Sequence, residues 1–234
     1  MTKFKIGIVV ADTDEYKSIL EFFKNKEYED YSFLNRTGHK FYLEKDGEKA
    51  EVISVLCGIG KVNATAAAMH LIDTGCNIIM NYGLSGGISG ISRGELMVCD
   101  RFLEHDFDLT GIGYKPCEKP SQKYIYDADK ELAQLFLEKV LEVKKGTAVS
   151  GDRFVCDAEL RNSLRDNFGA MSCDMETAAI AYVCDFSGVP FFALRRISDD
   201  AGADAMDDYR EMNTSDETLL SDYIMEFIYK ILEA

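Results

Sequence analysis

The sequence predicts one α/β domain in which helices cover a mixed central β-sheet. Short, apolar, β-rich runs alternate along the chain with segments whose apolar residues recur at helical spacing. The 234 residues, 47% of them hydrophobic, are enough to build a single core. The sequence contains no repeat, no low-complexity tract and no dividing linker, so residues 1–234 are interpreted as a single domain.

The first half of the chain alternates strand and helix. Residues 4–11 are apolar and rich in β-branched side chains, which predicts a first strand. Residues 12–23 place Tyr16, Ile19 and Phe23 on one helical face. The other expected elements of this half are strands at 31–36 and 40–44 in a meander around Gly38 and Gly47, a strand at 50–57, an alanine-rich helix at 62–74 and a buried strand at 77–82.

The second half begins with a strand and a long loop. Two of the three prolines lie in residues 106–122, and long loops in compact domains tend to be functional. Asp157 is expected to cap a helix at 157–167. Residues 215–232 carry their apolar side chains on one face, which predicts an amphipathic helix. The remaining expected elements are strands at 96–102, 147–150 and 190–197 and helices at 127–142 and 175–186.

Composition excludes several classes of function. The net charge of −15 opposes binding to nucleic acid and to anionic membranes. No apolar run approaches the roughly 20 residues of a membrane span, and the start lacks the pattern of a secretory signal. The seven cysteines are odd in number and form no CxxC pair, which favours free thiols in a reducing compartment. We therefore expect a cytoplasmic protein that needs no metal and no cofactor.

Acidic and glycine-rich segments follow the buried strands, where α/β sheets collect ligands. Asp12, Asp14 and Glu15 follow the first strand. They either cap the next helix, with Asp12 and Glu15 as a box-like pair, or supply a base for water. Residues 83–87, Gly-Leu-Ser-Gly-Gly, form a tight turn or allow the backbone to approach a ligand closely.

Two more acidic junctions lie later in the chain. Asp174 and Glu176 flank Met175 and either cap a helix or accept hydrogen bonds from a ribose diol. Ser198 and Asp199 end an apolar strand, where an aspartic acid keeps its proton near neutral pH or serves as a cap. Together the junctions offer separated carboxylates, as acid–base cleavage of a glycosidic bond requires.

Five short motifs occur in a familiar order along nearly the whole chain. They are Gly-Ile-Gly-Lys-Val at 58–62, the glycine-rich turn at 83–87, Ser-Gly-Asp-Arg-Phe at 150–154, Asp-Met-Glu at 174–176 and Ile-Ser-Asp at 197–199. This set resembles the 5'-methylthioadenosine/S-adenosylhomocysteine nucleosidases of the nucleoside phosphorylase/nucleosidase superfamily. The resemblance implies a three-layer α/β/α sandwich with a twisted mixed sheet, a homodimer, and hydrolysis of the N-glycosidic bond of adenine nucleosides.

The resemblance also implies residue roles. Glu15 matches the acid that activates the attacking water, and Asp199, supported by Ser198, matches the acid that protonates purine N7. Glu176 matches the acid that binds the ribose hydroxyls. The resemblance further implies substrate contacts from Ile59, Leu84, Leu109, Phe154, Val155, Asp174, Met175 and Tyr209, and from Ile112 and Tyr114 of the partner subunit. The acidic stretch 199–208 is expected to be a lid with Tyr209 as its plug, or else a solvated loop.

Some positions depart from the family pattern. Leu84 stands where the family commonly has a small hydroxyl residue, and Asp12 where it often has methionine near the 5' pocket, so the preferred 5'-substituent stays open. Asp174 replaces a glutamate, and Arg196 replaces an alanine.

Three other functions are compatible with the same fold. A phosphorylase of the superfamily would place an arginine at Asn81 and a hydroxyl at Leu84, and no basic residue lies between Cys76 and Gly90, which favours water as the nucleophile. The other two alternatives are a nucleoside-binding protein that has lost catalysis and a hydrolase of another purine nucleoside, such as a futalosine-type compound.

Overall fold

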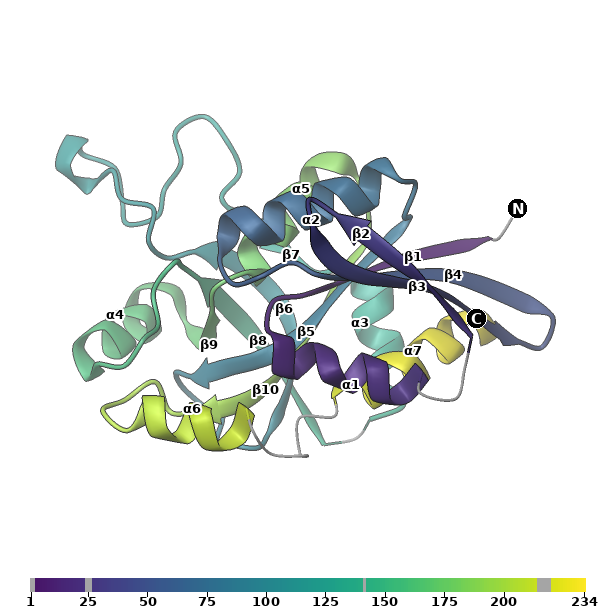
Figure 1. Ribbon diagram of the computed structural model, residues 1–234. Coiled ribbons are helices and arrows are strands. Elements are labelled where there is room, and N and C mark those ends of the chain that lie inside the picture. The colour runs from purple at the N-terminus through teal and green to yellow at the C-terminus, as the bar shows by residue number, and fades with distance from the viewer. Residues whose placement is uncertain (1–2, 24–26, 141, 214–219) are drawn as a thin grey trace.

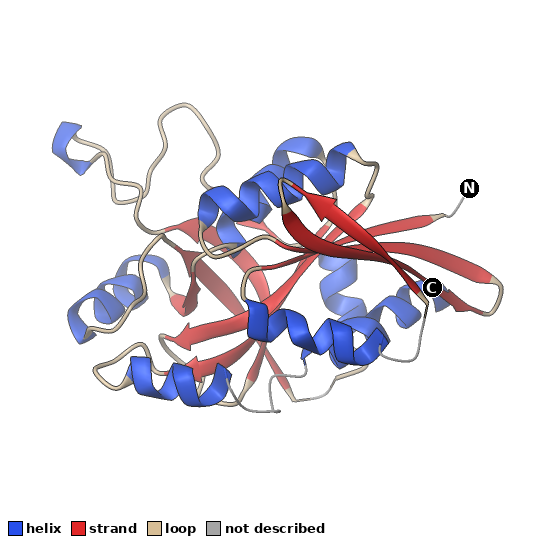
Figure 2. Ribbon diagram, in the orientation of Figure 1, coloured by secondary structure: helices blue, strands red, loops and turns tan. Residues whose placement is uncertain are grey.

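A computed structural model describes residues 3–23, 27–140, 142–213 and 220–234. It shows a mixed β-sheet with helices on both faces (Figures 1 and 2). In chain order the elements are β1 (Phe4–Val10), α1 (Thr13–Phe23), β2 (Tyr28–Phe33), β3 (Arg36–Lys45), β4 (Glu48–Leu56), α2 (Lys61–Asp73), β5 (Ile78–Gly87), β6 (Leu96–Glu104), the 3-10 helix η1 (Thr110–Ile112), β7 (Ile125–Asp127), α3 (Lys130–Leu137), β8 (Val143–Ser150), α4 (Ala158–Phe168), β9 (Ala170–Asp174), α5 (Thr177–Ser187), β10 (Phe191–Asp199), α6 (Ala205–Asn213) and α7 (Leu220–Glu233).

Five strands of the sheet close into a ring. β5 pairs in parallel with β10, β10 runs antiparallel to β6, β6 is parallel to β8, β8 is parallel to β9, and β9 returns antiparallel to β5. β1 pairs in parallel with both β5 and β4, and the β4–β3–β2 meander continues the sheet away from the ring (Figure 1). The carboxyl ends of β1, β5 and β10 therefore meet at one edge, where ligands collect in such sheets.

The core has one apolar layer on each face of the sheet. Alternate residues of β1 show the division: Ile6 and Ile8 pack with α1, α3 and α7, whereas Val9 packs with α2 and α5. This arrangement confirms the predicted three-layer architecture. No described helix combines the length and the apolar character needed to cross a membrane. All seven cysteines are free; six are buried, and Cys156 is exposed.

The meander is where the prediction placed it, but its first turn is not at Gly38. The β2–β3 turn is Leu34–Asn35, with φ of 46° and 59°, and the β3–β4 turn is Asp46–Gly47, with φ of 53° and 86°. Positive φ at both central residues is the type I′ geometry that matches the twist of a hairpin. Gly38 lies inside β3 instead, where a Cβ would lie 2.6 Å from the Ser54 carbonyl oxygen and only glycine leaves room for it.

Other differences concern the ends of elements and two short segments. The helix predicted at 127–142 is α3, Lys130–Leu137, because Asp127 belongs to β7 and the Asp129 side chain caps the helix by accepting from the Glu131 and Leu132 amides. The strand predicted at 147–150 begins at Val143, and β9 was not predicted. α6 is a helix within the predicted acidic lid segment and beyond it. Of the helix predicted at 215–232, residues 215–219 lie outside the described residues.

Candidate active site

A cavity of about 360 Å³ opens at the carboxyl ends of β1, β5 and β10. It brings together Glu15, Glu176 and Asp199, which come from three distant parts of the chain. Its described lining residues are Ala11, Asp12, Glu15, Ile59, Leu84, Ser85, Gly86, Phe154, Cys173, Asp174, Met175, Glu176, Ser198, Asp199 and Tyr209. All three acids expected to act on one glycosidic bond therefore face a single cleft.

Glu15 is held by the glycine-rich turn rather than by its own helix. Its Oε1 accepts a hydrogen bond from the Leu84 amide at 2.7 Å. Gly83 leaves room for the carboxylate in this position, because a Cβ there would lie 2.7 Å from Glu15 Oε1. The predicted box-like pair is therefore not formed: Asp12 caps α1 by accepting from the Asp14 amide at 2.8 Å, while Glu15 points into the cleft. Burial raises the pKa of Glu15 to about 8, although the Leu84 amide and the Arg195 charge oppose the shift.

Asp174 and Arg195 form a buried ion pair beneath the cleft. Arg195 Nε donates to Asp174 Oδ2 at 3.0 Å, and both side chains are 2% exposed. Asp174 Oδ1 accepts from Ser150 Oγ at 2.5 Å and from the amides of Glu176 and Thr177, both at 3.0 Å. Burial disfavours the ionised form of Asp174, but Arg195 and these donors outweigh it and lower its pKa. Protein donors engage both oxygens of Asp174, so its carboxylate positions its neighbours; it also lines the cleft, and the substrate contact expected of it stays a prediction.

Arg195 is the residue that sequence reasoning missed. Its guanidinium also donates to Thr177 Oγ1 at 2.5 Å and to Asn81 Oδ1, so Asn81, which stands where a phosphorylase would carry an arginine, serves as a partner for this buried cation. The Arg195 charge lowers the pKa of both Glu15 and Glu176. The sequence does carry a signal for it: Arg195 directly follows the apolar run Phe191–Leu194, and a buried arginine needs a partner for its charge.

Glu176 faces the cleft at the start of α5. Its Oε1 accepts from the Gly60 amide at 2.8 Å, which ties α5 to the loop before α2. Burial, and after it the charge of Asp174, raise its pKa to about 7, while the Gly60 amide opposes the shift. Met175 lies beside it in the cleft lining. A carboxyl group poised near neutral pH and buried beside Met175 fits the predicted contact with ribose hydroxyls.

Asp199 lies at the end of β10 with its carboxyl held on both oxygens. Ser198 Oγ donates to Oδ2 at 2.6 Å, and the Ala201 amide donates to Oδ1 at 2.8 Å. Burial raises the pKa of Asp199, with the two hydrogen bonds opposing it. A Cβ at Gly86 would lie 3.1 Å from Asp199 Oδ1, so the glycine-rich turn also makes room for this acid.

Aromatic side chains border the mouth of the cleft. Phe154 and Tyr209 meet edge to face, with ring centroids 5.7 Å apart, and both line the cavity. A smaller hollow of about 40 Å³ adjoins the cleft: it shares Phe154 and Asp199 with the cleft and is also lined by Arg153 and Val155. Tyr209 belongs to α6, which Arg93 holds through ion pairs to Asp208 at 3.0 Å and Glu211 at 2.8 Å.

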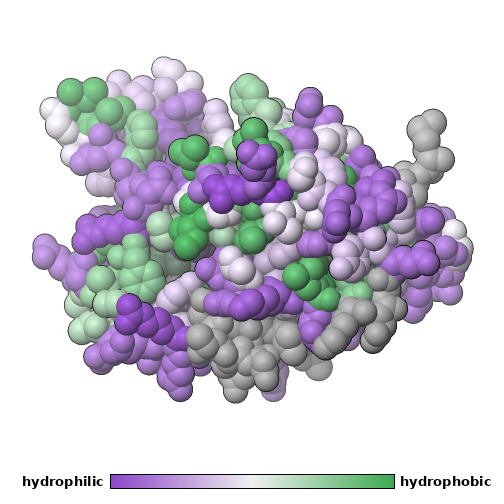
Figure 3. All heavy atoms as spheres, in the orientation of Figure 1, coloured by the Kyte–Doolittle hydropathy of each residue, from purple (hydrophilic) through white to green (hydrophobic). Residues whose placement is uncertain are grey.

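Three predicted contacts are not in the cleft of this single chain. Leu109, Ile112 and Tyr114 lie on the segment around η1, which projects from the body of the domain (Figure 1). Ile112 is 72% exposed and Tyr114 is 37% exposed. Figure 3 shows apolar atoms at the outer end of this projection. An isolated protomer therefore leaves these apolar side chains uncovered.

The wall of the 360 Å³ cavity is acidic, and Arg153 lines only the smaller hollow that adjoins it. Among the described residues that line the 360 Å³ cavity, five are acidic and none is lysine or arginine. Phosphate binding would need a cationic group at this surface, whereas a neutral nucleoside and water do not. Within the described part of the chain, no group of three or more His, Cys, Asp or Glu side chains is arranged to hold a metal ion.

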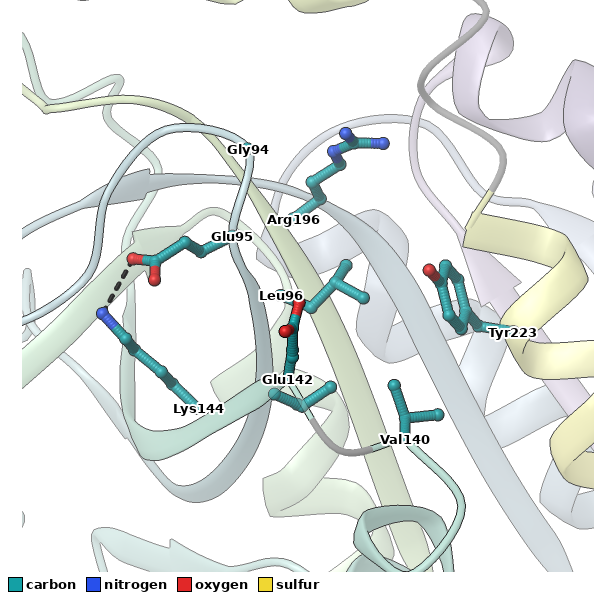
Figure 4. Close-up of a pocket in the computed structure, with 9 residues that line it drawn as sticks. Gly94, Glu95, Leu96, Val140, Glu142, Lys144, Arg196 and Tyr223 are labelled. Atoms are coloured by element: carbon teal, nitrogen blue, oxygen red, sulfur yellow. Dashed lines mark hydrogen bonds and ion pairs between the residues drawn. The ribbon is translucent and has the colours of Figure 1, made fainter.

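A second, larger hollow of about 620 Å³ lies where β6 and β8 begin (Figure 4). It is lined by Glu95, Lys144, Arg196 and Tyr223 together with Gly94, Leu96, Val140, Glu142 and Val143. Glu95 Oε2 accepts from Lys144 Nζ at 2.8 Å, so acid and base neutralise each other there. None of the predicted site residues lines this hollow.

Comparisons with known proteins find relatives that cover nearly the whole chain. Residues 5–229 match the model of the phosphorylase superfamily. The chain is 30% identical over 233 residues to an aminodeoxyfutalosine nucleosidase of Campylobacter jejuni, covering 97% of this chain and 99% of that protein. It is 33% identical over 217 residues to a 5'-methylthioadenosine/S-adenosylhomocysteine nucleosidase of Tolumonas auensis, covering 88% and 91%.

A solved structure shows the same architecture. The nucleosidase of this name from Helicobacter pylori, crystallised with butyl-thio-DADMe-Immucillin-A, superposes with a TM-score of 0.89 at 27% identity, covering 96% of this chain and 97% of that one. The chain therefore belongs to the phosphorylase superfamily, and the resemblance to its nucleosidases is confirmed.

Proposed function

We propose that this protein hydrolyses the N-glycosidic bond of adenine nucleosides of the 5'-methylthioadenosine and S-adenosylhomocysteine type, releasing adenine and a 5-substituted ribose. The observation that carries the proposal is the convergence of Glu15, Glu176 and Asp199 on one cleft that has no cationic lining residue among those described. Relatives with nucleosidase activity in their names support the same reaction.

The carboxyl environments suit the separate steps of such a reaction. Departure of the base leaves oxocarbenium character on the ribose, and protonation of the purine makes adenine a better leaving group. Asp199, whose pKa burial raises, lies in the cleft at the end of β10 and is the group that donates this proton. Glu176 carries negative charge beside the developing cation when ionised. Glu15, with a pKa of about 8, is a stronger base than an ordinary carboxylate once it is ionised, and accepts the proton of the attacking water.

The protein is further proposed to act as a cytoplasmic homodimer. The exposed apolar side chains of Ile112 and Tyr114 support an interface, since a projecting apolar segment gains stability when a second chain covers it. In this arrangement Ile112 and Tyr114 of one protomer complete the cleft of the other, and Leu109 contributes to the wall for the 5'-substituent.

A second substrate is favoured by one observation. The relative from Campylobacter jejuni is named for aminodeoxyfutalosine and aligns with 97% of this chain. Aminodeoxyfutalosine is therefore a candidate alongside 5'-methylthioadenosine and S-adenosylhomocysteine. The same acid–base groups would act on it, so only the 5' end of the cleft distinguishes the substrates.

The test is a panel of nucleosides incubated with the protein in the presence and absence of phosphate, with free base measured by chromatography. We expect adenine release from adenine nucleosides that is independent of phosphate. A strict requirement for phosphate would identify a phosphorylase, and tight binding of nucleosides without any base release would identify a binding protein.

A further inference from the structure

Helix α2 begins at the edge of the cleft without a side-chain cap of its own. Gly60 precedes its first residue, Lys61, and has no side chain to accept from the free amides of the first turn. Two carboxylates from distant parts of the chain accept from these amides instead. Glu176 Oε1 accepts from the Gly60 amide at 2.8 Å. Asp152 Oδ1 accepts from the Lys61 amide, also at 2.8 Å, so consecutive amides hold a carboxylate inside the cleft and one outside its lining.

The backbone of Gly60 depends on such contacts for its orientation. Its φ of 101° is in a region that favours glycine, and a Cβ there would lie 3.1 Å from Asp152 Oδ1. A glycine rotates more easily than other residues, so the direction of its amide has to be fixed by hydrogen bonds around it. Asn63 Nδ2 donates to the Ile59 carbonyl at 2.6 Å, but Asn63 belongs to α2 and moves with it. Asp152 instead ties the first turn of α2 to the segment that follows β8.

Asp152 is itself held by a closed cycle of hydrogen bonds. Its amide donates to Asp106 Oδ2 at 2.9 Å, and Asp106 Oδ1 accepts from Lys61 Nζ at 2.5 Å. With the bond from the Lys61 amide to Asp152, the cycle is complete. Glu104 Oε1 pairs with the same ammonium at 3.3 Å. Because each member is held by the other two, the cycle fixes Asp152 more firmly than a single bond would.

The direction of the Gly60 amide affects the charge of Glu176. Burial and the charge of Asp174 raise the pKa of Glu176, and the Gly60 amide opposes them. Such a bond stabilises the ionised carboxylate and weakens steeply when its angle is lost. The other charged or titratable groups that interact with Glu176 are Arg195, Glu15, Cys57 and Tyr209. Removal of the Asp152 side chain leaves all of these groups in place.

We propose that Asp152 is a positioning residue for Glu176: through the Lys61 amide it holds the start of α2 so that the Gly60 amide meets the Glu176 carboxylate. Asp152 lines neither the cleft nor the smaller hollow beside it, so it acts through the backbone and not on the substrate. This inference rests on the proposed function, because it concerns the carboxylate that binds the ribose hydroxyls.

The experiment measures how the binding of 5'-methylthioadenosine depends on pH. Full-length protein carrying Glu15→Gln, which stops hydrolysis and removes the titration of Glu15, is compared with the same protein carrying Asp152→Ala or Asp152→Asn. The asparagine removes the charge but retains an oxygen that accepts from the Lys61 amide. Asp129→Ala is the matched control, because Asp129 caps α3 and does not line the cleft. Affinity is measured by calorimetry between about pH 5 and pH 9.

We expect Asp152→Ala to move the midpoint of the pH dependence upward by about half a pH unit, which lowers affinity below the midpoint about threefold. The midpoint should return to within about 0.2 of its original value in Asp152→Asn. Asp129→Ala should lower Tm without moving the midpoint, since it removes only a helix cap. An unchanged midpoint in Asp152→Ala would overturn the positioning role. An equal shift in Asp152→Asn would also overturn it, because the charge and not the hydrogen bond would then be responsible.

A failure of the proposed function gives a different result. The unchanged protein would then release no adenine, and the Glu15→Gln protein would not bind the nucleoside at any pH. The link between Asp152 and Glu176 would still be measurable from the Tm values of Asp152→Ala, Glu176→Gln and the double variant. We expect these shifts to be non-additive, because both residues hold the same turn. Additive shifts would overturn the positioning role independently of any activity.

Discussion

The two hollows of this molecule differ in chemistry more than in size. The hollow in Figure 4 is the larger, about 620 Å³ against about 360 Å³, yet its acid Glu95 is paired with Lys144, which lowers the pKa of Glu95. In the cleft, burial raises the pKa of Glu15 to about 8 and that of Glu176 to about 7. Carboxyl groups held against their electrostatic preference mark a reactive site better than volume does.

The buried cation explains how the cleft tolerates so much acid. Arg195 pairs with Asp174 and opposes the rise in the pKa of Glu15 and Glu176, but it is buried and is not among the lining residues. Its positive charge therefore stabilises the ionised carboxylates of the cleft, although its guanidinium does not line the cavity. In the larger hollow, Lys144 and Arg196 line the surface itself.

The largest expected effect is that of Asp199→Asn. The amide cannot donate an acidic proton to the leaving purine, so kcat for adenine release should fall by about 10³-fold, within the range for loss of a general acid. Nucleoside binding, measured by calorimetry, should persist. Asp166→Asn is the control: Asp166 is exposed on α4 and lies outside the cleft lining, so it should change kcat by less than about twofold. Near-normal turnover by Asp199→Asn would remove this residue from the mechanism.

Glu15→Gln should be the next most damaging change. The amide still accepts from the Leu84 amide but cannot take a proton from water, so hydrolysis should fall by about 10²–10³-fold while nucleoside affinity is retained. Glu95→Gln provides the matched substitution in the larger hollow and should leave kcat/KM unchanged within about twofold. Equal losses in the two variants would contradict the distinction between the hollows.

Glu15→Gln also tests the raised pKa of Glu15 through the pH dependence of thermal stability. Because the pKa of Glu15 in the folded protein, about 8, is above its ordinary value of 4.5, the folded state binds more protons between these pH values. The contribution of Glu15 to stability is therefore present at low pH and is lost as pH rises from about 4.5 to 8. Thermal unfolding of the unchanged protein and of Glu15→Gln should show a Tm gap that widens in favour of the variant between pH 5 and pH 9, by about 2–4 °C per kcal/mol. A constant gap would show that Glu15 is not destabilised by ionisation.

Local sequence patterns were enough to predict most of the helices and strands, and the strand ends that two of the three acids follow. Apolar runs marked the ends of the strands that deliver Glu15 and Asp199, and these ends could be located without knowing the strand order. The sequence left open whether Glu15 caps the helix together with Asp12 or serves as a base in the cleft, because an acid three residues after Asp12 fits both roles. Only the approach of the Leu84 amide, 69 residues away in the chain, decides it.

Contacts between residues far apart in the chain could not be predicted from local sequence patterns. Arg195 pairs with Asp174, 21 residues away, and with Asn81, 114 residues away. β9 is a strand of five residues whose antiparallel pairing to β5 closes the ring, and so short a segment has little periodicity of its own. The turn is at Leu34–Asn35 and not at Gly38, whose glycine leaves room for the Ser54 carbonyl inside β3.

The smallest expected effect is that of Arg196→Met, which compares the two hollows within one strand. Arg195 and Arg196 are neighbours in β10, and successive side chains of a strand point to opposite faces: Arg195 reaches Asp174, while Arg196 lines the larger hollow. Arg195→Met leaves Asp174 buried without its cation, which costs about 3–5 kcal/mol of unfolding free energy. It should also move the acid limb of the pH–rate profile to higher pH, because the Arg195 charge opposes the rise in the pKa of Glu15 and Glu176. Arg196→Met should leave kcat/KM and the pH profile within about twofold of the unchanged protein. A tenfold loss of kcat/KM in Arg196→Met at unchanged Tm would mean that the larger hollow acts on the cleft through β10, and the two regions could no longer be treated as chemically separate.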